Sequence, residues 1–65
     1  MKSISIIIPI YNTGKYLQDC LTSIIEEMRD YDELILVDDG SKDDSYYICL
    51  KNKKHNVYII KNSNH

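Results

Sequence analysis

The chain has 65 residues, two of them cysteines, which is enough for one small domain or for part of a larger one. Its 8 basic and 10 acidic residues give a net charge of −2, which does not favour a nucleic-acid binder, and no apolar run approaches the roughly 20 residues that span a bilayer. Two cysteines are too few for a disulfide scaffold, so we expect reduced thiols and a cytoplasmic protein.

Residues 4–10 form the first predicted strand. The segment reads ISIIIPI, an apolar run rich in β-branched residues, and it is typical of a buried strand in a parallel sheet. Because Pro9 has no N–H to donate, we expect strand pairing to stop near it. The turn YNTG follows, and either Asn12 or Thr13 is placed to cap a helix.

Apolar residues recur at spacings of three and four in residues 14–29, which predicts an amphipathic helix with one face on a sheet. The predicted buried stripe consists of Leu17, Cys20, Leu21, Ile24, Ile25 and Met28. Both Cys20 and Cys49 fall in apolar patterns, so we expect each thiol to pack as a small apolar side chain.

Two further strands and one helix are predicted in the second half of the chain. Residues 34–37 are a continuous apolar run, as in a buried strand, and residues 57–60 predict a short third strand. Between them Ser41 begins the sequence SKDD, which resembles a capping box, so we expect Ser41 to cap a helix over residues 42–53. The residues that this helix buries are predicted to be mainly Ser45, Ile48 and Cys49. Residues 61–65 are polar.

The order strand, helix, strand, helix, strand predicts an α/β fold with a three-stranded parallel sheet. Right-handed crossovers in one direction place both helices on the same face of that sheet. The other face then stays bare and the first strand presents an unpaired edge, which is a site for association with another chain. We therefore expect the opening segment of a larger α/β domain, cut off after the third strand. The alternative is a non-catalytic fragment that associates with another chain, such as a second copy of itself, through this edge.

Candidate binding residues lie at the carboxyl ends of the first two predicted strands, where open α/β sheets bind their ligands. Pro9 and Tyr11 follow the first strand, and Asp38 and Asp39 follow the second. The aromatic face of Tyr11 suits stacking on a base, and a nearby carboxylate could accept the N–H of a pyrimidine ring. The glycine-rich motif that holds a pyrophosphate in dinucleotide folds is absent, so the pattern favours a nucleoside slot.

Each of these residues also has a structural interpretation. Tyr11 could be a partly packed loop aromatic, Asp38 a buried partner of loop amides, and Asp39 a helix cap. A metal site made of Asp38 and Asp39 alone is not expected, because neighbouring residues that leave a strand point in opposite directions. A receiver-type signalling domain is disfavoured by the order of its motifs, since such domains carry the acidic pair after the first strand.

Together these motifs resemble the beginning of the family 2 glycosyltransferases. The resemblance rests on SIIIPIYNTGKYLQDCLTSI, then DELILVDDGSKDDS, then VYIIKNSN, in which P-x-Y-N after one strand and V-D-D-G-S after the next stand at the family's spacing. It implies the opening of a GT-A, Rossmann-like domain, with residues 1–65 as its partial N-terminal nucleotide-sugar-binding segment.

The resemblance also implies roles for single residues. Pro9 and Tyr11 would line the nucleotide base, Asp39 would contact the base ring, and Asp38 would support the loop or the nucleoside. The donor would be a nucleotide-diphosphate sugar, typically of the uridine type, and the reaction would transfer its sugar to an acceptor hydroxyl.

The family's metal and base residues are the point at which the resemblance stops. The full-length family uses a divalent metal, Mg or Mn, held by a D-x-D motif, and an acidic base. In the family the D-x-D motif stands at the end of a fourth strand and the base comes later. Neither is present here, so no metal-binding or catalytic residue is assigned, and we expect a truncated segment that is inactive alone.

Overall fold

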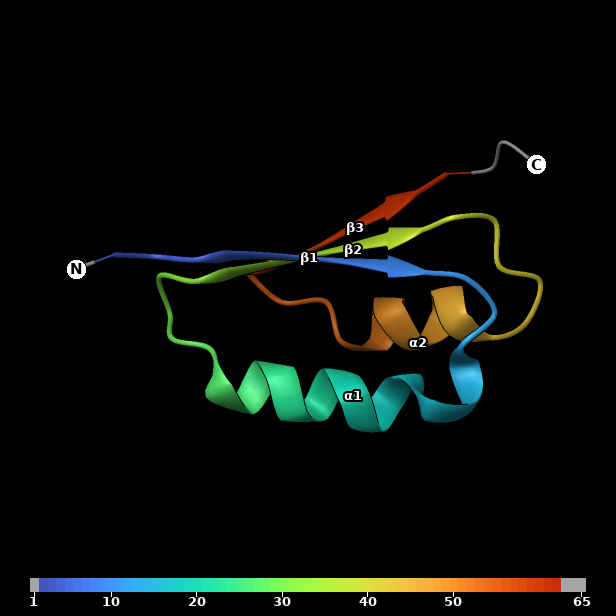
Figure 1. Cartoon of the computed structure of the whole chain (residues 1–65), viewed down its shortest axis with the longest axis horizontal. Coiled ribbons are helices and arrows are strands. Elements are labelled where there is room, and N and C mark those ends of the chain that lie inside the picture. Colours follow the sequence, from blue (N-terminus) through green and yellow to red (C-terminus); the bar gives the residue numbers. More distant parts are fainter. Residues whose placement is uncertain (1, 63–65) are drawn as a thin grey trace.

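The computed structural model describes residues 2–62 as a three-stranded parallel sheet with two helices, which confirms the predicted fold class (Figure 1). The strand order in the sheet is β1-β2-β3, so β2 is the central strand. In chain order the elements are β1 (Ser5–Ile10), α1 (Gly14–Glu27), β2 (Glu33–Asp38), α2 (Ser45–Lys51) and β3 (Val57–Lys61). The last three residues of the predicted polar stretch 61–65 lie outside the described residues. None of the described helices is long and apolar enough to cross a membrane.

Both helices lie against one face of the sheet, as the two crossovers predict (Figure 1). Successive side chains of a strand point to opposite faces, and in β2 every second side chain, including Leu34 and Leu36, is fully buried beneath the sheet. From the helix side, Leu17 and Leu21 meet them. The buried apolar residues are Ile10, Leu17, Leu21, Leu34, Leu36, Cys49 and Val57.

The opposite face of the sheet is bare over the described residues. Here the register aligns Ile7 with Ile35 and Tyr58 across the three strands. Because Ile7 remains 64% exposed and Tyr58 47% exposed, neither helix covers these side chains. The prediction of one uncovered apolar face is confirmed.

Strand pairing of β1 stops one residue beyond Pro9, close to where its missing N–H predicts. Register pairs continue through Pro9 to Ile10, which lies opposite Asp38. The carbonyl oxygens of Ile4 and Ile10 accept N–H groups from the β2 segment, so the even-numbered residues of β1 bond to β2. Pro9 therefore directs its nitrogen toward the open edge of β1, where no donor is needed.

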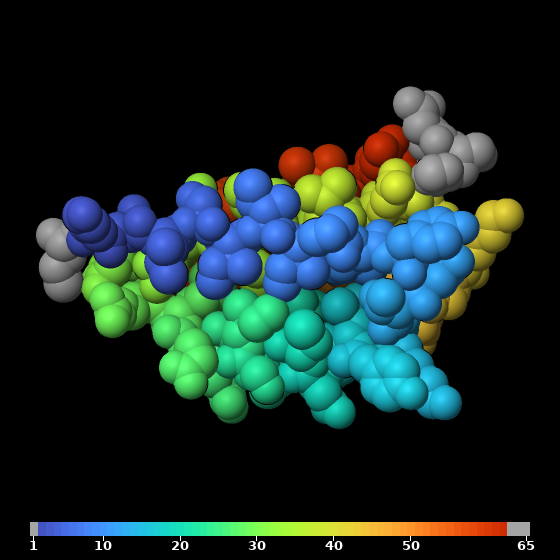
Figure 2. Space-filling model, viewed as in Figure 1, coloured from blue at the N-terminus to red at the C-terminus, as the bar shows by residue number. Residues whose placement is uncertain are grey.

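The helix α1 agrees closely with the prediction, except at Cys20. This residue is exposed, because it lies on the side of α1 that faces the open edge of β1. In space-filling form, α1 (green to cyan) runs along β1 (blue) for most of its length (Figure 2). The buried thiol is Cys49, on α2, as predicted.

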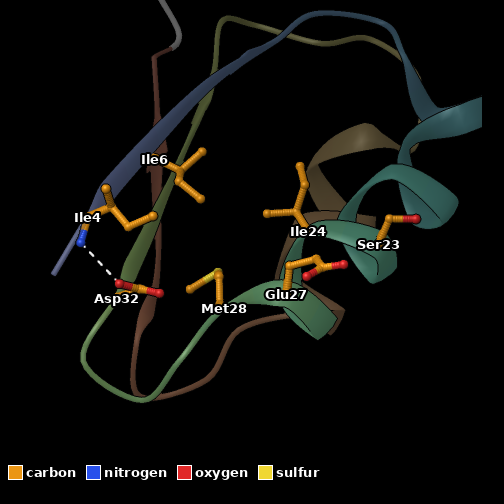
Figure 3. A pocket seen from close by; sticks show the side chains of 7 residues that line it. All are labelled: Ile4, Ile6, Ser23, Ile24, Glu27, Met28 and Asp32. Carbon is orange, nitrogen blue, oxygen red and sulfur yellow. Dashed lines mark hydrogen bonds between the residues drawn. The ribbon is translucent and has the colours of Figure 1, made fainter.

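An apolar groove of about 270 Å³ lies between β1 and α1 (Figure 3). Seven residues line it: Ile4, Ile6, Ser23, Ile24, Glu27, Met28 and Asp32. Ile4 and Asp32 immediately precede β1 and β2, and the N–H of Ile4 donates a hydrogen bond of 3.0 Å to Asp32 Oδ1. The groove is thus at the amino ends of the strands, away from the edge at which the candidate binding residues lie.

Candidate functional site

Two loops meet at the carboxyl ends of β1 and β2. The first loop (residues 11–13) connects β1 to α1, and the second loop (residues 39–44) connects β2 to α2. They start side by side, because Ile10 pairs with Asp38 and the N–H of Asp39 donates a hydrogen bond of 2.9 Å to the carbonyl oxygen of Ile10. The candidate residues Tyr11 and Asp39 therefore leave neighbouring strands at the same edge of the sheet.

A reciprocal pair of hydrogen bonds joins the two loops. The N–H of Asn12 donates to Ser41 Oγ over 2.9 Å, and the N–H of Lys42 donates to Asn12 Oδ1 over 2.8 Å. Asn12 has a φ of 51°, in the left-handed region that asparagine tolerates better than most residues. We call this pair of hydrogen bonds the Asn12–Ser41 bridge.

The second loop and the start of α2 also satisfy the first N–H groups of α1. Thr13 is the N-cap residue of α1 but makes no side-chain capping bond. Instead, its N–H donates to Ser45 Oγ over 2.9 Å, and the N–H of Gly14 donates to Asp43 Oδ2 over 3.1 Å. Hydrogen bonds from Ser45, through its hydroxyl and its N–H, are the main reason that the pKa of Asp43 is lowered. These contacts hold the two loops and both helix starts together.

Ser41 does not have the capping role that the sequence predicts. Helix α2 begins at Ser45 with Asp44 as its N-cap residue, so the predicted start at residue 42 is wrong. Ser41 precedes that N-cap, and its hydroxyl accepts the N–H of Asn12 from the other loop. The local S-x-x-D pattern correctly indicates that the Ser41 hydroxyl accepts a main-chain N–H. That N–H belongs to Asn12 in the first loop, however, and not to the start of α2.

The two adjacent aspartates lie in different surroundings. Asp38 is fully buried on the helix-covered face, and neither of its carboxylate oxygens has a hydrogen-bond partner among residues 2–62. It lies near Cys49, and burial, followed by the charge of Asp38, raises the pKa of that thiol to about 11. Asp39 is half-buried, and its Oδ1 accepts a hydrogen bond of 3.1 Å from Asn62 Nδ2.

The remaining predicted site residues are at the surface of the same edge. Tyr11 is 51% exposed, and Pro9 is exposed one residue before the end of β1. Asn62, which the sequence reasoning did not single out, follows β3 and donates its main-chain N–H to the carbonyl oxygen of Asp38 over 2.7 Å. The rule that ligands bind beyond the carboxyl ends of parallel strands could have indicated Asn62, since it follows the third strand of the sheet.

No metal cluster is found in the part of the chain that the structure describes: residues 2–62 bring no three His, Cys, Asp or Glu side chains close enough to hold an ion. The site instead offers a half-exposed aromatic ring, a half-buried carboxylate and an amide side chain, from Tyr11, Asp39 and Asn62. A ring for stacking and groups that accept or donate hydrogen bonds are what a planar heterocycle requires.

Comparison with known proteins gives a family match over most of the chain. A family model described as Glycosyl transferase family 2 matches residues 5–65. The chain is 54% identical over 46 residues to glycosyltransferase GlyG of Streptococcus pneumoniae serotype 4, which covers 71% of the chain and 15% of that protein. It is 42% identical over 66 residues to minor teichoic acid biosynthesis protein GgaA of Bacillus subtilis, which covers 92% of the chain and 15% of that protein.

A third similar protein is a UDP-N-acetylglucosamine–dolichyl-phosphate N-acetylglucosaminyltransferase of Methanococcus voltae. The chain is 43% identical to it over 47 residues, which covers 72% of the chain and 18% of that protein. The chain thus spans less than a fifth of the length of each of these three relatives.

Proposed function

The chain belongs to glycosyl transferase family 2, and from this premise we propose that its site binds the nucleoside of a nucleotide-diphosphate sugar. The observation that carries the proposal is the common origin of Tyr11 and Asp39 at the ends of two paired strands, held by the hydrogen bond between Asp39 and Ile10. A base that stacks on Tyr11 would present its ring edge to the carboxylate of Asp39.

Uridine is the base that we propose for this slot. The N3–H of uracil is a donor that suits a carboxylate acceptor, whereas its carbonyl oxygens suit donors such as the Asn62 amide. The printed name of the Methanococcus voltae relative includes a uridine diphosphate sugar, which supports the same choice.

Pro9 and Asp38 complete the proposed slot in less direct ways. Pro9 lies one residue before the first loop and would border the base from the open edge of β1. Asp38 would support the slot from below: its carbonyl oxygen accepts the N–H of Asn62, while its carboxylate points into the helix-covered side. In this proposal Asp38 positions Asn62, and Asp39 contacts the base.

For the whole enzyme we propose transfer of a sugar from the nucleotide to an acceptor hydroxyl, with a divalent metal ion, Mg or Mn, at the diphosphate. Such a metal would neutralise the charge that develops on the leaving diphosphate. The proposal gives residues 2–62 the binding of the donor nucleoside and assigns no metal ligand or catalytic base among them. Free thiols at Cys20 and Cys49 support a reducing, cytoplasmic location.

Calorimetric titration of the chain with uridine diphosphate tests the proposed slot. Stacking on an aromatic side chain contributes about 1–3 kcal/mol per base, so we expect Tyr11→Ala to weaken binding by roughly fivefold to a hundredfold. Tyr58→Ala is the matched control, because Tyr58 is 47% exposed against 51% for Tyr11 but lies on the bare face of β3.

The acceptor role of Asp39 has its own control. Asp39→Ala should also weaken binding, whereas Asp30→Ala, in the exposed turn between α1 and β2, should leave the affinity unchanged. Binding of uridine diphosphate that is the same in the wild type and in both site variants would refute the slot.

A second role, self-association through the open edge of β1, is favoured by the exposure of Ile7 on the adjoining bare face. Pro9 works against it, since it removes one N–H from the row that a partner strand would use. Sedimentation velocity at increasing concentration tests this second role. A monomer at all concentrations excludes self-association, and Ile7→Lys should abolish any dimer.

A further inference from the structure

We propose that Asn12 and Ser41 are positioning residues for the nucleoside slot, and that the Asn12–Ser41 bridge holds Tyr11 and Asp39 at the separation that the base requires. This inference rests on the proposed function of the same site. It assigns a role to two side chains that would not themselves touch the nucleotide.

The bridge acts next to both contact residues. Asn12 directly follows Tyr11, and Ser41 follows Asp39 with only Gly40 between them. Gly40 has a φ of 79°, a left-handed conformation that glycine adopts without steric cost, so the second loop turns sharply just after Asp39. The bridge therefore joins the two loops immediately after Tyr11 and Gly40.

The bridge uses both residue types specifically. Asn12 supplies a main-chain donor to Ser41 and a side-chain acceptor to Lys42, so the two hydrogen bonds run in opposite directions between the loops. This reciprocity fixes the rotation of one loop against the other as well as the distance between them. A side chain without an acceptor at position 12, or without a hydroxyl at position 41, would remove one bond of the pair.

The position of the bridge also separates its role from that of the other contacts between the loops. Ser45 and Asp43 bind the N–H groups of Thr13 and Gly14, at the start of α1 and farther along the chain from Tyr11. Those contacts join the starts of the two helices and involve none of the atoms of the bridge. Loss of the bridge should therefore loosen the slot without unfolding the chain.

Two variants each remove one bond of the bridge, and two conservative variants retain both bonds. Ser41→Ala deletes the acceptor of the Asn12 N–H, and Asn12→Gly deletes the side-chain acceptor while tolerating the positive φ of this position. Ser41→Thr retains the hydroxyl, and Asn12→Asp retains the side-chain oxygen. Ser23→Ala, on the exposed surface of α1, is the control for loss of a serine hydroxyl.

The first measurement needs no ligand. Backbone ¹⁵N relaxation reports the mobility of Tyr11 and Asp39, and we expect their order parameters to fall in Ser41→Ala and Asn12→Gly and to recover in the conservative variants. Order parameters that stay at their wild-type values in both deletion variants would overturn the inference.

The second measurement is the affinity for uridine diphosphate, obtained from chemical-shift changes during a titration. Each deletion variant is expected to bind about fivefold more weakly than the wild type, with rescue by Ser41→Thr and Asn12→Asp and no change in Ser23→Ala. A purely structural role would lower the melting temperature but leave the affinity of the folded variants unchanged, and that result overturns the positioning role alone. Absence of binding by the wild type overturns the proposed function and this inference together.

Discussion

Replacement of Asp38 is expected to stabilise the chain, which is unusual for a buried residue of a central strand. Its carboxylate is fully buried on the helix-covered face, and neither oxygen has a hydrogen-bond partner within residues 2–62. Most buried polar groups in proteins are paired, because an unpaired one gives up its hydration without compensation. We predict that Asp38→Val, a β-branched residue suited to a strand, removes this cost.

The magnitude follows from the desolvation of the carboxylate. An unsatisfied buried polar group costs about 1–3 kcal/mol, so Asp38→Val should raise the free energy of unfolding by about that amount. Asp38→Asn should give a smaller increase, because it removes the charge but leaves an unpaired amide at the same position. For a chain of this size, each kcal/mol corresponds to a rise in melting temperature of roughly 4–8 °C.

Urea denaturation followed by circular dichroism measures this change, with Asp30→Val as the control. Asp30 is exposed in the turn before β2, and substitution there should alter the free energy of unfolding by less than about 0.5 kcal/mol. A loss of stability in Asp38→Val would refute the reasoning, since it would mean that the carboxylate has a favourable partner in the folded chain. A thiol titration gives a second readout: because the charge of Asp38 contributes to the raised pKa of Cys49, that pKa should fall below about 11 in the variant.

Two further predictions concern other titratable groups. Asp43→Asn should destabilise the chain at about pH 6 but much less at about pH 2.5. The lowered pKa of Asp43 means that its ionised carboxylate stabilises the fold above the unfolded-state pKa of 3.8. This stabilisation is lost as the pH falls through the folded-state pKa of Asp43. Melting temperatures at both pH values measure it, and an equal loss at the two would contradict it. At about pH 8, iodoacetamide should alkylate the exposed Cys20 and spare Cys49, whose thiol is buried and protonated. Mass spectrometry after partial reaction checks this, and equal labelling of the two thiols would contradict it.

The retention of an unpaired carboxylate at position 38 is informative about function. Groups that cost stability are often found at functional sites, where binding or chemistry requires them. The main-chain carbonyl of Asp38 accepts the N–H of Asn62, and Asp38→Val keeps this bond, so an effect on the proposed slot would come from the carboxylate itself. The test of Asp38→Val therefore also reveals whether stability is gained at the expense of affinity for the nucleotide.

The sequence by itself determined the elements, their order and the edge at which the site lies. Runs of apolar residues predict three strands and the spacing of Leu17 and Leu21 predicts α1, because both patterns follow from the repeat of the element itself. The expected burial of the first strand is wrong for the side chains on the bare face, such as Ile7. Since all three strands are parallel, their carboxyl ends meet at one edge, which places Tyr11 and Asp39 at the same edge; the pairing of β1 with β2 makes them neighbours. The bare face of the sheet could be predicted as well, from the number of helices available to cover it.

Only the tertiary structure decided which side chains bind to which loop. The acceptors Ser41, Asp43 and Ser45 serve N–H groups that are 29 to 32 residues away along the chain, and no local pattern contains this pairing. A capping motif shows that a serine can accept an N–H, but the folded chain brings a competing donor from the first loop to Ser41. The exposure of Cys20 was decided in the same way, since it depends on which neighbour lies beside the open edge of β1. Periodicity fixes the face on which a residue lies, whereas its partner depends on the packing of elements that are distant in sequence.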